Sequence, residues 1–290
     1  MFSTINSKYI SSVSAEVEVL REKPMPSIPS LNAQKDYGTL RQEGVAMIRK
    51  GWIWMLLLIV PVGIRYLIKG RELMADDVFE ALMKDQRKPV IYLRSFAADK
   101  QRSKSLVDLV GSASTGLFYS PSIELKIFQG LPGNFKRKFG PYIGIAEPGD
   151  FPPCLGVSKC YVEDRDWKRA LLWMLEKSQL AVVRIGQGDG LFWELAVVLL
   201  LFPRERILLV IDPTSVPDRE LRQTYDKMSR DLSDSFKLRF PENISGSRVF
   251  TISSEGEVEH HKANVLTAIL TGNPFGMSIR KATTSIPTLS

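Results

Sequence analysis

The chain has 290 residues, 44% of them hydrophobic, and a formal net charge of +7. This length allows one large domain or two modest ones, and the composition is sufficient for a packed core. The basic residues are scattered without a long Lys/Arg tract, which argues against nucleic-acid binding. The two cysteines, Cys154 and Cys160, lie far from the adjacent His260 and His261. They do not form a zinc or disulfide framework, so we expect no metal.

The first 49 residues carry no signal-peptide pattern, since no basic stretch leads promptly into an apolar run with a cleavage site. Residues 23–30 are rich in proline and serine, a composition typical of flexible segments. We therefore expect residues 1–49 to be a flexible N-terminal region.

The next segment, residues 50–70, is predicted to enter a membrane. Its apolar run has aromatic residues near both ends and basic residues on both flanks, which is the pattern of a membrane helix. The run is at the short limit for a spanning helix, and Pro61 and Gly63 would kink it or make it re-entrant. The alternative is a buried core helix. The similar charge of the two flanks leaves the orientation open.

Beyond a connecting amphipathic helix at 71–88, the pattern changes to short apolar strands that alternate with helices. The expected strands are 89–96, 142–146, 180–185, 207–211 and 248–252. The expected helices are 101–111, 122–129, 166–177, 193–202, 217–234 and 262–270. This alternation predicts an α/β domain over 89–273, with a parallel five-stranded sheet and helices on both faces. The Ser/Thr-rich tail, 274–290, is expected to be disordered.

The most informative stretch runs from Arg184 to Leu195, where a strand, a glycine-rich turn and an apolar helix follow one another. Glu194 is expected in the first turn of that helix, within an almost wholly apolar run. Since an isolated buried charge is very costly, such a carboxylate is paired, protonated or used in chemistry. Ligands of parallel α/β sheets bind beyond the carboxyl ends of the strands, which is where Glu194 is predicted to lie.

Other residues just after the predicted strands complete a candidate cleft around Glu194. We expect them to bind substrate: Arg94, Ser95, Asp99, Gly149, Arg184, Gly186, Gly190 and Trp193. The arginines suit a pyrophosphate, the glycines allow close approach of a ligand, and Trp193 can stack on a base.

A plainer interpretation of the same residues stays open. Glu194 near a helix start is favoured by the helix dipole alone, and Arg184 could pair with it as a structural bridge. The glycines could serve only a tight turn, and Trp193 could belong to the core. Ser95 could be a cap.

The layout of residues 89–270 resembles that of TIR domains. The matching features are the run Leu93-Arg94-Ser95-Phe96 with Asp99, the Pro-Gly loop at 147–153, and the pair Trp193-Glu194. In TIR domains the tryptophan and glutamate are separated by a few residues, so their adjacency here departs from the family pattern. Nucleoside deoxyribosyltransferase-like proteins are similar in fold and are a related possibility.

This resemblance implies a TIR/flavodoxin-like fold and an NAD glycohydrolase-type activity. Glu194 would be the catalytic carboxylate that acts on the N-glycosidic bond of NAD or a related nucleotide, with NAD as substrate and no cofactor. A carboxylate beside the ribose carbon stabilises the positive charge that bond cleavage creates. We expect a protein of bacterial defence or stress signalling that contacts lipid, self-associates and holds its α/β domain in the cytoplasm. The alternative is a non-catalytic nucleotide-binding or self-assembling scaffold at the membrane.

Overall fold

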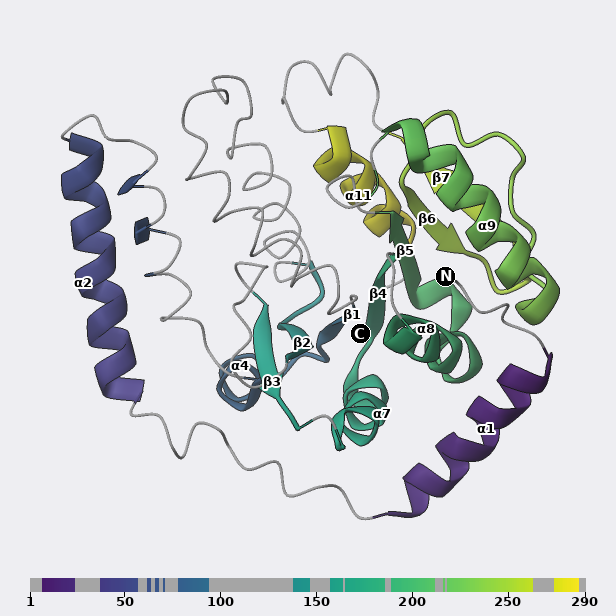
Figure 1. The fold of residues 1–290 in the computed structure, drawn as a ribbon, viewed down its shortest axis with the longest axis horizontal. Helices are drawn as coiled ribbons and strands as arrows, with labels where there is room; N and C mark the ends of the chain where they lie inside the picture. The colour runs from purple at the N-terminus through teal and green to yellow at the C-terminus, as the bar shows by residue number, and fades with distance from the viewer. Residues whose placement is uncertain are drawn as a thin grey trace.

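A single mixed sheet organises the chain in the computed structural model (Figure 1). The described residues are 7–23, 37–56, 62–63, 66–67, 70, 78–93, 138–146, 157–163, 165–185, 189–211, 216, 218–262 and 274–286. The strands are β1 (Val90–Leu93), β2 (Tyr142–Ala146), β3 (Ser158–Tyr161), β4 (Leu180–Ile185), β5 (Ile207–Ile211), β6 (Val249–Ile252) and β7 (Val258–His261). The helices are α1 (Ser7–Glu22), α2 (Tyr37–Leu56), α4 (Val78–Lys84), α7 (Trp167–Lys177), α8 (Asp189–Leu201), η2 (Arg204–Arg206), α9 (Asp218–Phe236) and α11 (Pro274–Ser285).

The strands lie in the order β3-β2-β1-β4-β5-β6-β7. The first five of these are parallel neighbours, whereas β6 runs antiparallel to β5, and β7 antiparallel to β6. Strands β1, β4 and β5 are buried along their whole length, which explains their apolar sequences, interrupted by one charged residue, Arg184 of β4. The α/β class is therefore confirmed.

The prediction of a parallel five-stranded sheet is wrong, because the sheet is mixed and has seven strands. Residues 237–248 return the chain from the end of α9 to the carboxyl end of β5. There the backbone N–H of Ile211 donates to the carbonyl of Arg248 at 2.8 Å. Strand β6 starts at that point, so it has to run back along β5 in the opposite direction.

The two strands that sequence did not predict, β3 and β7, lie at the two edges of the sheet. Their sequences, Ser-Lys-Cys-Tyr and Val-Glu-His-His, mix polar and apolar residues. Edge strands have no neighbour on one side and tolerate such residues, so they carry little of the apolar signal that identifies a central strand.

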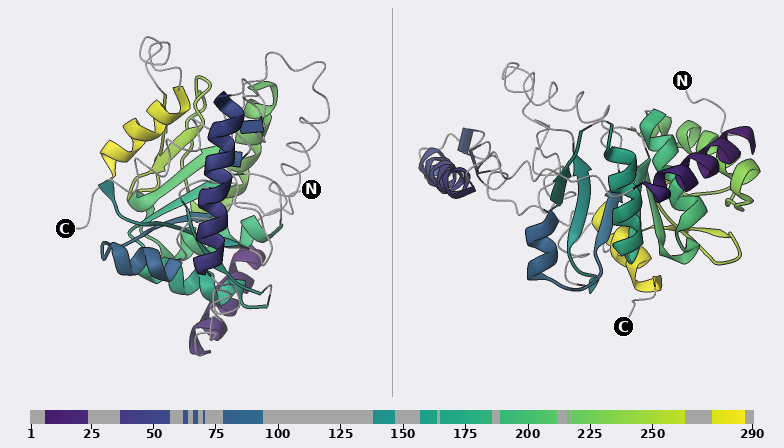
Figure 2. Two further views of the ribbon diagram at one scale, coloured as in Figure 1. Left: turned by 90° about the vertical axis from the view of Figure 1, so that its left-hand side faces the viewer. Right: turned by 90° about the horizontal axis from the view of Figure 1, so that it is seen from below.

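Helices cover both faces of the sheet, as predicted (Figure 2). One face packs its apolar residues with those of α7, α8 and α9, and the core on this side also includes Val13 and Val17 of α1. The opposite face packs with Ile279 and Ala282 of α11 and with Ile286, which directly follows the helix.

Both chain ends contain helices that the sequence did not predict. The flexible region expected over 1–49 includes α1 and most of α2, and the disordered tail expected over 274–290 includes α11. Two of these helices, α1 and α11, bury apolar side chains in the core, and that burial offsets the weak helix signal of their sequences. The predicted helix at 262–270 lies largely outside the described residues.

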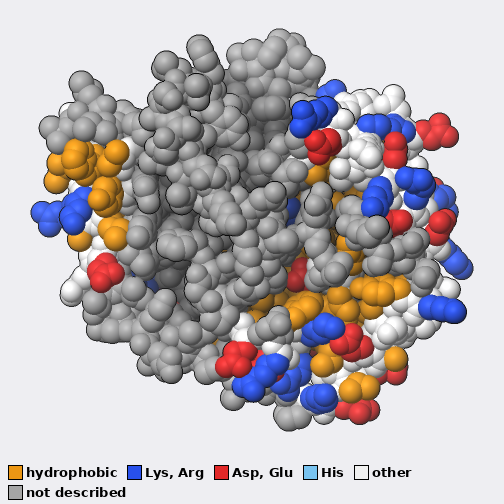
Figure 3. Space-filling model, viewed as in Figure 1, with side chains coloured by type: hydrophobic (Ala, Val, Ile, Leu, Met, Phe, Trp, Pro, Cys, Tyr) orange, Lys and Arg blue, Asp and Glu red, His pale blue; other side chains and the backbone are white. Residues whose placement is uncertain are grey.

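Helix α2 stands away from the sheet (Figures 1 and 2). An ion pair between Arg41 and Glu80, 2.6 Å long, joins it to α4. Apolar side chains gather on its exposed surface (Figure 3). They include Trp52, Ile53 and Leu56, which are 56%, 55% and 81% exposed.

The predicted membrane segment, 50–70, begins inside α2, which ends at Leu56. Within the part of the chain that the structure describes, no helix is both long enough and apolar enough to cross a membrane. The connecting helix expected over 71–88 corresponds to the shorter α4, with residues 71–77 outside the described part.

Tyr225 of α9 packs this helix against the sheet. Its ring stacks on Phe250 at 5.4 Å between centroids, and its hydroxyl donates to the carbonyl of Pro241 at 2.5 Å. Burial raises the pKa of Tyr225 from 10.0 to about 12.

Alkaline pH is therefore expected to destabilise the protein through Tyr225. The neutral phenol stabilises the fold fully below pH 10.0, and this contribution is lost as the pH rises toward about 12. Urea unfolding at several pH values in this interval checks the prediction, with Tyr225→Phe as the reference. The wild type should lose more free energy of unfolding across the interval than Tyr225→Phe, and equal losses would contradict the assignment.

Candidate functional site

The sheet reverses its winding direction between β1 and β4, which are parallel neighbours. From β1 the chain continues to β2 on one side, and from β4 it continues to β5 on the other. In open α/β sheets, ligands bind at the carboxyl ends of the two strands that flank such a switch point. The carboxyl end of β1 is Leu93 and that of β4 is Ile185.

Arg184 lies at this switch point, one residue before the end of β4. Its side chain is 6% exposed and its Nη1 lies 3.4 Å from the hydroxyl of Tyr92 on β1. The Tyr92 ring in turn lies 5.4 Å from that of Tyr142 on β2. The guanidinium therefore lies beside the phenol of Tyr92, and the ring of Tyr92 contacts that of Tyr142 on the next strand.

Tyr92 is a member of this group that the sequence analysis missed. It precedes Arg94 by two residues, and the alternation of side chains along a strand would place both on one face. The spacing of Tyr92 and Arg94 could have identified Tyr92 as a site residue. It was overlooked because a tyrosine in an apolar strand is typical of core packing.

Helix α8 begins at Asp189, four residues before the predicted start. Glu194 therefore lies in the second turn of α8, and the expectation that it lies in the first turn is wrong. The glycines between β4 and the predicted helix indicated a turn that extends past Gly190, but Gly190 is the second residue of α8. Because the dipole effect falls off within the first turn, it contributes less to Glu194 than the sequence suggested.

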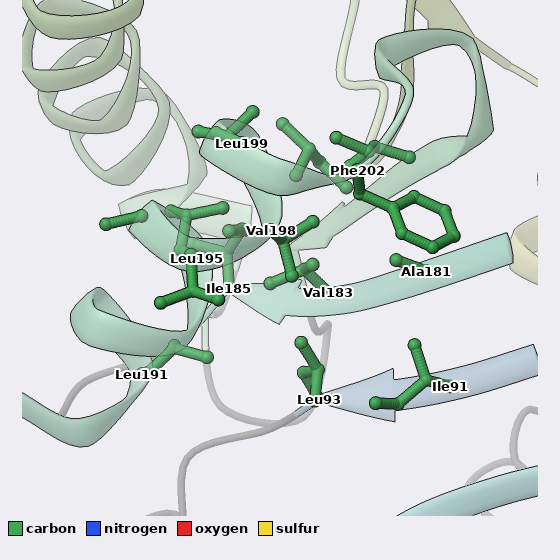
Figure 4. Close-up of a cluster of buried hydrophobic side chains, with 14 of the residues drawn as sticks. Ile91, Leu93, Ala181, Val183, Ile185, Leu191, Leu195, Val198, Leu199 and Phe202 are labelled. Carbon is green, nitrogen blue, oxygen red and sulfur yellow. The ribbon is translucent and has the colours of Figure 1, made fainter. Parts of the chain in front are cut away.

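Glu194 is buried, with 2% of its surface exposed. It lies three residues after Leu191 and four before Val198, so these three share one side of the helix. Figure 4 shows Leu195 next to Ile185 at the carboxyl end of β4, with Leu191 on the preceding turn of α8. Glu194 thus lies on the turn of α8 that covers the switch point.

Arg184 and Glu194 belong to opposite sides of the sheet. Side chains alternate along β4, and Ala181, Val183 and Ile185 pack with the α8 side of the core. Arg184 alternates with them and shares the other face with Tyr92. A ligand at the carboxyl edge of β1 and β4 would lie between the two groups.

Trp193 faces the neighbouring helices. Its indole N–H donates to Oε2 of Glu16 on α1 at 2.9 Å. Its ring meets Trp167 of α7 edge-on, with centroids 5.1 Å apart, and the ammonium of Lys168 lies 4.8 Å above it. Lys168 also forms an ion pair of 2.7 Å with Glu16. These contacts make Trp193 the packing centre of α1, α7 and α8, as the plainer interpretation had it.

The remaining predicted site residues lie outside the described part of the chain: Arg94, Ser95, Asp99, Gly149 and Gly186. In sequence, Arg94 and Ser95 directly follow β1, and Gly186 directly follows β4. Within the described residues, no group of three or more His, Cys, Asp or Glu side chains is placed to hold a metal ion.

Comparison with known proteins gives no relative for this chain: no family model, no curated protein and no solved structure matches it. The functional argument therefore depends on the geometry at the switch point.

Proposed function

We propose that this chain is a membrane-attached, TIR-like α/β protein that binds NAD or a related nucleotide and cleaves its N-glycosidic bond. The observation that carries the proposal is the switch point between β1 and β4, which has Arg184 on one side and Glu194 on the other. The nucleotide would bind across the carboxyl ends of these two strands.

The order of the sheet supports the TIR-like part of the proposal. Taken alone, the five strands predicted from sequence are β1, β2, β4, β5 and β6, and they lie in the order β2-β1-β4-β5-β6. Numbered one to five, this is the order 2-1-3-4-5 of flavodoxin-like sheets, which bind their ligand at the same switch point. The antiparallel direction of β6 is a departure from that pattern.

The chemistry assigns a role to each side of the site. Arg184 would bind the pyrophosphate through charge-assisted hydrogen bonds, with Arg94 and Ser95 after β1 as further contacts to phosphate or ribose. The backbone N–H groups at the start of α8 favour an anion. Glu194 would stabilise the positive charge that develops on the ribose as the bond to nicotinamide breaks.

A second candidate function is nucleotide binding without turnover, in a scaffold that self-associates at the membrane. The burial of Glu194 favours it, because a carboxylate that is 2% exposed has to become accessible before it can act on a ribose. Trp193, engaged by α1 and α7, also leaves the base without the predicted stacking partner.

One pair of measurements on the purified full chain separates these functions. Calorimetric titration with NAD tests binding, and release of nicotinamide tests cleavage. Binding with release supports the enzyme, binding without release supports the scaffold, and the absence of both overturns the proposed function. Light scattering with and without NAD tests self-association.

Arg184→Gln is expected to weaken NAD binding by roughly 10- to 100-fold, the loss that follows when one charge-assisted hydrogen-bond donor is removed. Arg222→Gln is the control, because Arg222 is exposed on α9 and its guanidinium contacts Asp226. Thermal melting of both variants distinguishes lost affinity from lost folding. Equal affinity in folded Arg184→Gln would remove Arg184 from the site.

A further inference from the structure

Helix α2 packs extremely closely against the chain that follows it. A Cβ atom on Gly51 would lie 2.8 Å from the carbonyl oxygen of Gly63, and one on Gly70 would lie 2.6 Å from that of Gly44. Such distances leave no room for a side chain, so the two backbones touch at glycines. Helices in membranes associate through small residues of this kind.

These contacts define an antiparallel pair. Gly51 meets Gly63 near the end of α2, and Gly44 meets Gly70 seven residues further along each arm. Residues 62–63, 66–67 and 70 have helical backbone. The described pieces 62–63, 66–67 and 70 therefore run in the opposite direction to α2, and Figure 1 draws them in blue beside it.

The reversal divides the apolar run that the sequence analysis assigned to a membrane. From Lys50 to Leu56, α2 rises about 9 Å at 1.5 Å per residue. The hydrocarbon core of a bilayer is about 30 Å thick, so this arm reaches into one leaflet only. Insertion to this depth is characteristic of interfacial, monotopic segments.

The exposed surface of α2 has basic side chains followed, toward the C-terminal end of the helix, by apolar ones. Its apolar end carries Trp52, Ile53 and Leu56, each more than half exposed. Arg49 and Lys50 are exposed directly before them. Figure 3 shows the apolar group on α2 with basic side chains next to it.

Basic residues flank both arms of the pair in sequence. Gly70 lies against Ile48, the neighbour of Arg49, and in sequence Gly70 is flanked by Lys69 and Arg71. The two basic flanks gave no orientation for a spanning helix. Arg49 and Lys50, the basic residues of the pair that the structure describes, are exposed and suit anionic headgroups.

We propose that α2 and the arm that follows it form a hairpin that inserts its apolar end into one leaflet of an anionic membrane. Both ends of the hairpin, and with them α1 and the α/β domain, then lie on the same side of the bilayer. The inference builds on the membrane attachment of the proposed function and is independent of the nucleotide chemistry.

A lipid leaflet suits this surface better than a second copy of the chain. The apolar residues occupy one end of the hairpin and are bordered by a tryptophan and by basic residues, which is the arrangement found at a membrane interface. Two copies joined through these ends would bring Arg49 and Lys50 of each chain close together. That juxtaposition is unfavourable for a dimer.

Vesicle flotation of the purified full chain tests the insertion. We expect binding to phosphatidylcholine vesicles that contain phosphatidylglycerol, and a loss of about fivefold in affinity for each charge removed in Arg49→Ser and Lys50→Ser. Leu56→Asp should lower binding at least about tenfold, since it places a charge in hydrocarbon. Val19→Asp, at an exposed position of α1, is the matched control and should bind like the wild type.

Single-cysteine labelling tests the hairpin against a spanning helix. With both native cysteines replaced by alanine, Glu43→Cys and Met83→Cys report on the two sides of the segment. A membrane-impermeant maleimide applied to intact cells should label both or neither, whereas a spanning helix would give opposite results. Opposite labelling overturns the hairpin, and nicotinamide release would be unaffected by that outcome. Failure of the chain to float with the vesicles overturns the insertion. Dimerisation through Leu56 instead of vesicle binding does so as well.

Discussion

Replacing Glu194 with glutamine is expected to reduce nicotinamide release from NAD by on the order of 10²- to 10⁴-fold, the usual contribution of a positioned carboxylate. Glutamine keeps the volume and one oxygen of the side chain but carries no charge. It therefore cannot stabilise the cationic ribose of the transition state. The variant therefore tests the catalytic role of Glu194 directly.

The measurement is the initial rate of nicotinamide release, combined with NAD affinity. A catalytic role predicts a large fall in kcat with nearly unchanged affinity. Glu176→Gln is the matched control, since this residue lies on α7 with a side chain that is 58% exposed. If Glu194→Gln is folded and releases nicotinamide at the rate of the wild type, Glu194 is not the catalytic carboxylate.

Replacing Trp193 with alanine is expected to lower the free energy of unfolding by about 3–5 kcal/mol, the typical loss for a buried tryptophan. The indole is 5% exposed and contacts Trp167 and Lys168, while its N–H donates to Glu16. Removing it leaves a cavity between three helices and deprives Glu16 of α1 of its hydrogen bond to α8. Urea unfolding followed by circular dichroism measures the change.

Two further variants separate the contributions of Trp193. Trp193→Phe keeps an aromatic ring but removes the donor to Glu16, so it should cost less than Trp193→Ala. Trp52→Ala, at a position 56% exposed, should change the free energy of unfolding by less than about 0.5 kcal/mol. A loss in Trp193→Ala no larger than that of Trp52→Ala would show that α1 does not depend on this residue.

The central strands could be predicted from the sequence because they are buried on both faces. The predicted strands 180–185, apolar except for Arg184, and 207–211, wholly apolar, match the observed strands residue for residue. The amphipathic helix predicted at 166–177 was equally clear, since α7 has one apolar side. These are local signals, and burial of the same residues produces them.

Other elements could not be predicted, because their stability comes from contacts distant in sequence. Helix α1 is secured by Val13, Val17 and Glu16, whose partners lie some 150 or more residues away in α7 and α8. The C-terminal α11 is fastened in a similar way: the ammonium of Lys138 donates to the carbonyls of Thr283 and Ile286.

The candidate site shows the same division between local and tertiary information. The sequence alone determined that Glu194 belongs to an apolar helix directly after a buried strand, because apolar periodicity is a local property of the chain. Only the tertiary structure decided that β4 pairs with β1 at a switch point, that Arg184 and Glu194 lie on opposite sides of the sheet, and that Trp193 packs between helices. It also decided that Gly63 and Gly70 lie against α2. Strand order, strand direction and helix pairing depend on which distant surfaces bury one another, and no stretch of sequence carries that information by itself.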